Sequence, residues 1–133
     1  MKKVIKGAAV FVAGVGLVVA TPSIASASDQ SWQVSSGGSV RGTASFDDAA
    51  NRVSVHDSQG DSGIVVVDIW RVGNKGGTHV RCKAGHDGEG GLGVNNNCPL
   101  IWVEDTNLAG ELCWKVGTSS DNRACSAVKE FFS

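Results

Sequence analysis

The pattern of hydrophobic and polar positions becomes strictly alternating at Val40. From there to Phe46, small or apolar residues alternate with Arg41, Thr43 and Ser45. A period of two is typical of a half-buried β-strand. The Asx-rich segment 47–51 predicts a turn. The alternation over 52–56 then predicts a second strand, which completes a hairpin.

The longest hydrophobic run after the N-terminal segment covers 64–72, "IVVVDIWRV". Its consecutive β-branched residues favour a strand over a helix. In a strand, Val65, Val67 and Ile69 share one face, which we expect to meet the core. Trp70 falls on the opposite face, where it is either half-exposed as an anchor for a partner or covered by a loop or a second sheet.

Shorter apolar segments follow at 79–83, 100–104 and 112–116, and each predicts a strand. The segment 124–132 is compatible with a strand or a short helix. Two tryptophans, Trp102 and Trp114, fall in these strands and are expected in the core. No long segment has helical periodicity, so the chain is predicted to be all-β. We expect an antiparallel β-sandwich of about six to eight short strands.

The first 27 residues read as a secretory signal peptide. Lys2, Lys3 and Lys6 precede an uncharged apolar run, and 25–27, "ASA", supplies the small residues of a cleavage site. The apolar run is shorter than the ~20 residues of a transmembrane helix. We therefore expect a secreted, extracellular protein that does not insert into a membrane.

The polar segment 28–39, "SDQSWQVSSGGS", shows no periodicity over its length and predicts a flexible leader before a domain at 40–133. Trp32 and Val34 are its only large apolar residues. A tryptophan in a flexible segment gains burial energy only by docking. It would dock on its own domain or, as an extended peptide, on another protein.

Charge limits the classes of partner. After residue 27 the chain has nine Lys and Arg against thirteen Asp and Glu, a net charge of about −4. Nucleic-acid binding requires a basic surface, and so does polybasic membrane attachment. Both are disfavoured, which leaves other secreted proteins as the expected partners.

Four cysteines in a small secreted chain predict two disulfides. Three pairings are possible, and we favour Cys82–Cys98 with Cys113–Cys125, each closing a short loop between neighbouring strands. Zinc binding is disfavoured because no Cys-x-x-Cys is present. Four acids lie in glycine-rich loops, but they lack the regular alternation of carboxylates found in a calcium-binding loop. We interpret them as surface-turn residues: Asp57, Asp61, Asp87 and Glu89. No metal or cofactor is predicted.

The tetrapeptide at 60–63, "GDSG", resembles the heart of the nucleophile motif of trypsin-like serine proteases. The histidine of those proteases lies far upstream, whereas His56 is only six residues before Ser62. Asp, Ser and Gly are also the residues that form turns. We therefore interpret the tetrapeptide as a turn and expect no catalytic residue.

Three stretches, "GTASFDD", "NRVSVHDSQGDSGIVVVDIW" and "ELCWKVGTSSDNRACSAVKEFF", resemble small secreted β-proteins of actinobacteria. Asp57, Asp61 and Gly63 match the family's turn, although this chain has Asp61-Ser62-Gly63-Ile64 where members often carry Asp-Gly-Trp-Gly. Further matches lie later in the chain: the cysteine pair Cys113 and Cys125, and a terminal aromatic residue at Phe131 or Phe132.

Within that group, the architecture is similar to the small subunit of the umbrella toxin particles of Streptomyces. That subunit links a lectin-like subunit to a large toxin-bearing subunit. The resemblance implies a non-enzymatic adaptor that binds through its N-terminal leader and a face of its sandwich, with Trp32, Val34 and Trp70 as partner-binding residues. The alternatives are a secreted protease inhibitor, with its reactive loop at 84–97, and a small antimicrobial protein.

Overall fold

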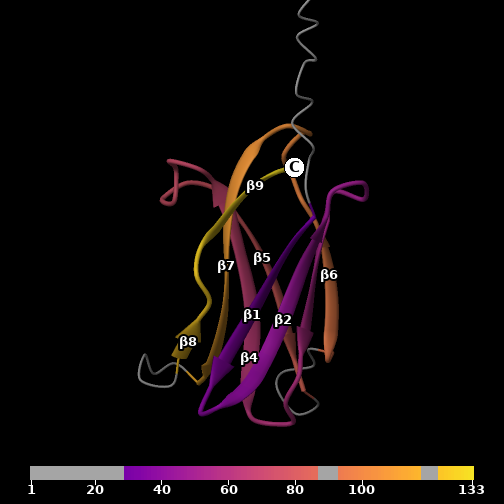
Figure 1. Cartoon of the computed structure of the whole chain (residues 1–133). Coiled ribbons are helices and arrows are strands. Elements are labelled where there is room, and N and C mark those ends of the chain that lie inside the picture. Colours follow the sequence, from indigo (N-terminus) through magenta and orange to yellow (C-terminus); the bar gives the residue numbers. More distant parts are fainter. Residues whose placement is uncertain (1–28, 87–92, 118–122) are drawn as a thin grey trace, which may run out of the picture.

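The computed structural model describes residues 29–86, 93–117 and 123–133, and within these ranges the chain forms nine strands in two antiparallel sheets (Figure 1). The first sheet has the order β1-β2-β3-β6, and the second has the order β5-β4-β7-β8, with β9 also paired to β7. The prediction of an all-β sandwich is confirmed. The strands are β1 (Gln30–Ser36), β2 (Ser39–Asp47), β3 (Arg52–Asp57), β4 (Gly63–Arg71), β5 (His79–Gly85), β6 (Asn95–Pro99), β7 (Asn107–Val116), β8 (Arg123–Cys125) and β9 (Lys129–Phe132).

The core lies between the sheets and follows the alternation in the sequence. On β4, Val65, Val67 and Ile69 are completely buried, as the period of two predicts. Phe46 on β2 packs its ring 4.8 Å from that of Phe131 on β9, so the C-terminal strand closes one side of the core. Trp102 and Trp114 are also buried, as expected.

The prediction of a flexible leader at 28–39 is wrong, because residues 30–36 form the edge strand β1, paired along its length with β2. Gly37 and Gly38 connect the two strands, and both have positive φ, as a two-residue hairpin turn of type I′ requires. The ring nitrogen Nε1 of Trp32 donates a hydrogen bond to the carbonyl oxygen of Gly110 at 3.0 Å. A Cβ at Gly110 would lie only 2.9 Å from the Trp32 ring, so the glycine allows this close approach.

Both predicted disulfides are present, but they connect different kinds of neighbours. Cys113 and Cys125 face each other on adjacent strands, β7 and β8. The bond between Cys82 on β5 and Cys98 on β6 instead joins the two sheets. The loop that it closes therefore connects two strands that are consecutive in the chain but belong to different sheets. Two disulfides indicate an oxidising, extracellular-type environment.

The segment 100–104 is not a strand, contrary to the prediction. The chain leaves the first sheet at Pro99 and must cross to the second sheet, where β7 begins at Asn107. Asp105 adopts a positive φ of 61° within this crossing. The segment 124–132, left open between strand and helix, contains the two short strands β8 and β9.

Candidate functional site

The three residues predicted to bind a partner are buried in their own domain, so that prediction is wrong. Trp32, Val34 and Trp70 are 2%, 1% and 4% exposed. Trp70 does lie on the outer face of the second sheet, but it is covered there. His79 stacks on its ring at 5.6 Å, and the Nζ atom of Lys75, from the β4–β5 turn, lies 4.8 Å from its centre.

The Gly60–Gly63 segment is a turn, and both carboxylate oxygens of its Asp61 have partners. The Oδ1 atom of Asp61 accepts hydrogen bonds from the backbone N–H of Gly63 at 2.8 Å and from Nε1 of Trp114 at 3.4 Å. Its Oδ2 atom pairs with Nη1 of Arg41 at 2.7 Å. Desolvation opposes ionisation, but these contacts prevail and lower the pKa of Asp61 below its usual value.

Two histidines near this turn have partners other than Ser62. The Nδ1 atom of His56 lies 2.6 Å from the amide oxygen of Asn95. The Nδ1 atom of His86 lies 3.3 Å from a carboxylate oxygen of Asp57, which is buried and also accepts from the backbone N–H of Gln59. Within the described ranges no hydrogen bond joins exposed Ser62 to a histidine, so the nucleophile–base contact of a serine protease is not formed there. Asp87, Glu89 and the rest of 87–92, six of the fourteen residues of the loop predicted for inhibition, lie outside the described residues.

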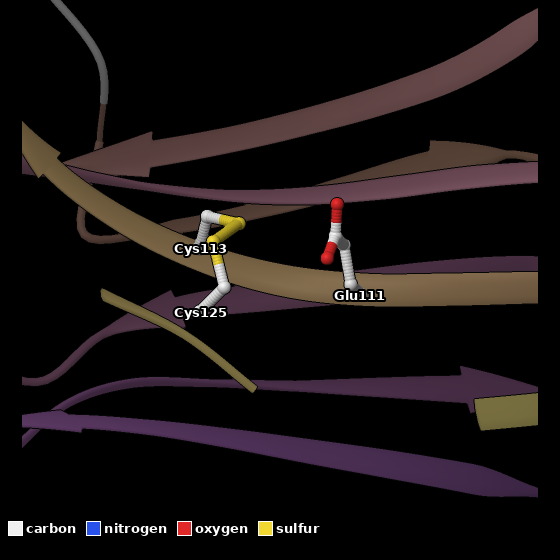
Figure 2. Close-up of side chains that lie close together, drawn as sticks. All are labelled: Glu111, Cys113 and Cys125. Atoms are coloured by element: carbon white, nitrogen blue, oxygen red, sulfur yellow. A yellow bond between two sulfur atoms is a disulfide. The ribbon is translucent and has the colours of Figure 1, made fainter. Parts of the chain in front are cut away.

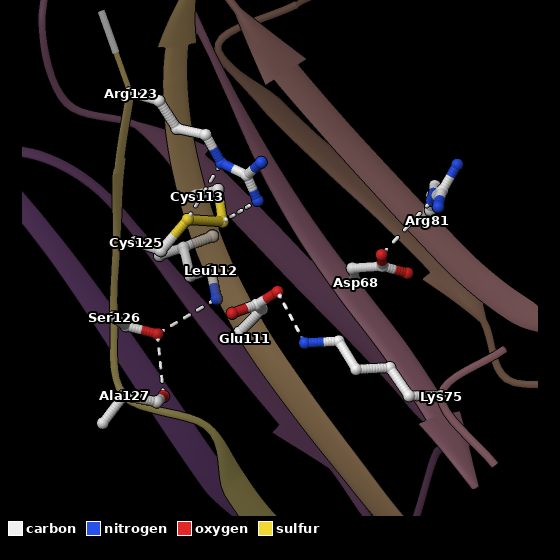
Figure 3. Close-up of a disulfide and its surroundings, with 10 residues drawn as sticks. All are labelled: Asp68, Lys75, Arg81, Glu111, Leu112, Cys113, Arg123, Cys125, Ser126 and Ala127. Atoms are coloured by element: carbon white, nitrogen blue, oxygen red, sulfur yellow. Dashed lines mark hydrogen bonds and ion pairs between the residues drawn. A yellow bond between two sulfur atoms is a disulfide. The ribbon is translucent and has the colours of Figure 1, made fainter. Parts of the chain in front are cut away.

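One group of potential metal ligands occurs among the described residues: Glu111, Cys113 and Cys125 on the outer face of the second sheet (Figure 2). The two cysteine sulfurs are bonded to each other, so neither is a thiolate that could bind a metal ion. The guanidinium of Arg123 lies against this disulfide, and Nε donates to the Cys125 sulfur at 3.2 Å (Figure 3). The nearby Glu111 pairs with Lys75 at 3.6 Å.

One end of the sandwich exposes large hydrophobic side chains. Here β4 and β9 end, and the β6–β7 connection crosses over at the top of Figure 1. Of the five large hydrophobic residues exposed in the described part of the chain, four lie at this end, and we call them the apolar end surface. They are Val72, Ile101, Val103 and Phe132, which are 36%, 62%, 76% and 42% exposed.

The register explains why two of these residues share a face. Val72 follows β4 directly, and its N–H donates to the carbonyl oxygen of Asn107 at 3.1 Å. Phe132 pairs with Asn107 from the other side. Side chains of directly opposed residues project to the same face of a sheet, so Val72 and Phe132 flank Asn107.

Hydrogen bonds fix the segment that carries the other two residues. The carbonyl oxygen of Asn51 accepts from the N–H of Leu100 at 2.9 Å, and the Asn51 side chain donates to the carbonyl oxygen of Trp102 at 3.0 Å. The carbonyl oxygen of Val103 accepts from the hydroxyl of Ser133 at 2.9 Å. Trp102 is buried between two exposed neighbours, so the segment presents Ile101 and Val103 outward from a fixed backbone.

No family model, curated protein or solved structure matches the chain. The described residues also contain no helix that is long and apolar enough to cross a membrane.

The apolar end surface was not predicted from the sequence, because the apolar residues at 100–104 indicated a strand. The signal was present in the order of residues: two bulky aliphatic residues alternate with a tryptophan and are followed at once by Glu104 and Asp105. Those two acids are exposed, and Asp48 lies in the turn that holds the segment. The nearest charges to Val103 along the chain are therefore negative.

Proposed function

We propose that the protein is a secreted, non-enzymatic binding protein, an adaptor subunit of an extracellular protein assembly, which docks through its apolar end surface. The single observation that carries the proposal is the concentration of exposed hydrophobic side chains at one end of the sandwich. Exposed apolar clusters of this kind mark sites of protein–protein interaction. Because hydrogen bonds already fix the backbone at Ile101 and Val103, little conformational entropy is lost on binding.

The chemistry of this end also indicates the partner. Aliphatic side chains bordered by Glu104 and Asp105 fit a protein surface with an apolar recess and Lys or Arg at its rim. In the arrangement suggested by the resemblance to umbrella toxin particles, that surface belongs to the large toxin-bearing subunit or the lectin-like subunit. The N-terminal segment has no part in docking in this proposal, because β1 is an edge strand of the sandwich.

The test is purification of the native complex from culture supernatant with a tagged, secreted protein. The double variant Ile101→Asp, Val103→Asp should lose the partner captured by the wild type. The matched control is Val128→Asp, because Val128 is also exposed, at 48%, but lies between β8 and β9, away from the apolar end surface. Burying Ile or Val contributes about 1.5–3 kcal/mol each, so the loss of both contacts should weaken binding by at least about 100-fold.

Two results would contradict the proposal. In one, the wild-type protein elutes alone as a monomer from native supernatant. In the other, the double variant retains the partner with unchanged affinity. Thermal unfolding of both variants checks that the fold is intact, which we expect because the substituted side chains contribute little to the core.

The same segment favours a second candidate, a secreted protease inhibitor, because exposed side chains on a fixed backbone are what an inhibitor presents to a protease. In this alternative the reactive segment is 99–103 rather than 84–97. Titration against subtilisin and trypsin separates the two candidates. Stoichiometric inhibition that is lost in the Ile101, Val103 variant would replace the adaptor proposal.

A further inference from the structure

The outer faces of the two sheets differ in their chemistry. The second sheet carries a groove of about 260 Å³, and six of its eight lining residues are charged, among them Arg81 and Lys83. The first sheet carries a larger groove of about 540 Å³, and no Lys, Arg, Asp or Glu of the described chain lines it. The larger groove has the volume of a small-ligand site, and the apolar end surface does not include it.

The groove crosses β2, β3 and β6 as two rows of cross-strand partners. Thr43 pairs with His56 and His56 pairs with Asn95, which gives the first row; Ser45, Ser54 and Asn97 form the second row in the same way. Three strands span about 10 Å, and the two rows lie about 7 Å apart along them. The floor is therefore large enough for a short segment of an oligomeric ligand.

Hydrogen bonds within the rows hold several of these side chains in place. The amide oxygen of Asn95 can only accept, so Nδ1–H of His56 donates to it at 2.6 Å, and Nε2 of the ring remains available to a ligand. The Nδ2 atom of Asn97 donates to the hydroxyl of Ser54 at 3.0 Å, and Nε of Arg52 donates to Oδ1 of the same Asn97 side chain. The Ser54 hydroxyl proton is thereby directed away from Asn97 and can donate elsewhere.

The main-chain groups beneath the groove do not point at a ligand that lies on this face. Residues 43–45 and 54–56 lie on strands that are paired on both sides, so their backbone groups are used between strands. Residues 95–97 lie on the edge strand β6, whose unpaired backbone groups point sideways from the sheet edge and not into the groove. An extended peptide is recognised chiefly through main-chain hydrogen bonds at an open strand edge. A ligand on this face must instead be recognised by hydroxyls, amides and one imidazole, each of which can donate or accept.

We propose that this groove binds a neutral oligosaccharide. Sugar hydroxyls donate and accept hydrogen bonds in the same way as the side chains that line the groove. Among the described residues no charged side chain lines the groove, in contrast to the opposite face, and this favours an uncharged ligand. The His56 ring supplies a flat surface on which a sugar ring can pack. The site is independent of docking at the apolar end surface, and the two together allow one molecule to bind a glycan and a protein at once.

The test is a nuclear magnetic resonance titration of the ¹⁵N-labelled secreted protein with cellohexaose, chitohexaose, xylohexaose and mannohexaose as neutral probes, and heparin as the anionic control. At least one neutral probe should shift the backbone amide signals of 43–45, 54–56 and 95–97, while heparin should leave them unchanged. Thr43→Ala and His56→Ala should each weaken binding of that probe by about 3- to 10-fold, because each removes one or two hydrogen-bonding groups. Ser35→Ala, exposed on β1 outside the groove, is the matched control and should bind as the wild type does.

Each remaining outcome overturns the proposal. If none of the four neutral probes shifts these amides, the groove does not bind neutral oligosaccharides of these classes, and the inference fails. If heparin shifts them instead, the ligand is anionic. If a neutral probe binds equally well to the Thr43 and His56 variants, it binds elsewhere. The melting temperature of each variant confirms that a loss of binding does not reflect a loss of fold. The partner purification described above is unaffected by any of these results.

Discussion

Asp61 provides a sharp test of the turn interpretation of the Gly60–Gly63 segment. Its carboxylate connects three parts of the fold: Gly63 at the start of β4, Trp114 on β7 and Arg41 on β2. The Arg41 guanidinium also lies over the Trp114 ring at 4.8 Å. If these contacts stabilise the end of the sandwich opposite the apolar end surface, removing the carboxylate must lower the free energy of unfolding.

The expected size of the loss follows from the individual contacts. The hydrogen bond from the Gly63 backbone should contribute about 1 kcal/mol, and the longer one from Trp114 less. The pair with Arg41 is partly exposed, so its contribution is about 0.5–1 kcal/mol. We therefore expect Asp61→Ala to destabilise the protein by about 2 kcal/mol, equivalent to a fall in melting temperature of roughly 10 °C for a domain of this size. Asp61→Asn keeps an acceptor oxygen and should lose only about 0.5–1 kcal/mol.

The pH dependence of stability separates the effect of the Asp61 charge from the effect of its side-chain shape. Because the pKa of Asp61 is lower in the folded protein than in the unfolded chain, the unfolded chain binds the proton more readily and acid favours unfolding. The stability from ionised Asp61 is therefore present above the unfolded pKa of about 3.9 and is lost as pH falls through the lower folded-state pKa. Urea unfolding should show wild type more stable than Asp61→Asn at neutral pH, with the difference shrinking in strong acid.

Ser62→Ala is the control, because Ser62 is exposed and should change stability by less than about 0.5 kcal/mol. The reasoning is refuted if Asp61→Ala is no more destabilising than Ser62→Ala, or if the difference between wild type and Asp61→Asn does not change with pH. A hydrolytic activity lost in Ser62→Ala would refute the turn interpretation itself.

Three further predictions concern stability. Trp32→Ala should cost about 3–5 kcal/mol in urea unfolding, because it empties a buried site, whereas a tryptophan in a flexible leader would cost almost nothing. Replacing both Cys82 and Cys98 by Ala should lower the free energy of unfolding by at least about 2–4 kcal/mol. The loss should exceed that for the other disulfide, because the Cys82–Cys98 bond joins the two sheets and Cys82 is fully buried. Calorimetry of the two double variants measures the difference. Hydrogen bonds to the Lys75 carbonyl and the Asp68 carboxylate raise the pKa of His79 above 6.5. The stabilisation of the fold by protonated His79 is therefore present below pH 6.5 and is lost as pH rises through the folded-state pKa. An NMR titration of the ring should give a midpoint above that of a model peptide.

The hydrophobic pattern alone determined the fold class and most of the core. Val65, Val67 and Ile69 are buried because a strand places every second side chain on one face. The cysteine pairing was also predictable, since the favoured order puts both bonds between segments that become strands. Gly37-Gly38 after Trp32 and Val34 was a readable hairpin signal as well. It was overlooked because the polar residues around it suggested a leader.

Only the tertiary structure decided which faces and ends are covered. Trp70 alternates onto the outer face as the sequence predicts, yet it is buried, because the turn that follows β4 brings Lys75 and His79 over it. Trp102 is buried as predicted, but Ile101 and Val103 are exposed at an end of the sandwich and not on a strand, because the chain crosses between the sheets there. Local periodicity records which side of a strand a residue occupies. What packs on that side depends on contacts between segments far apart in the chain, and those contacts place the apolar end surface and the neutral groove.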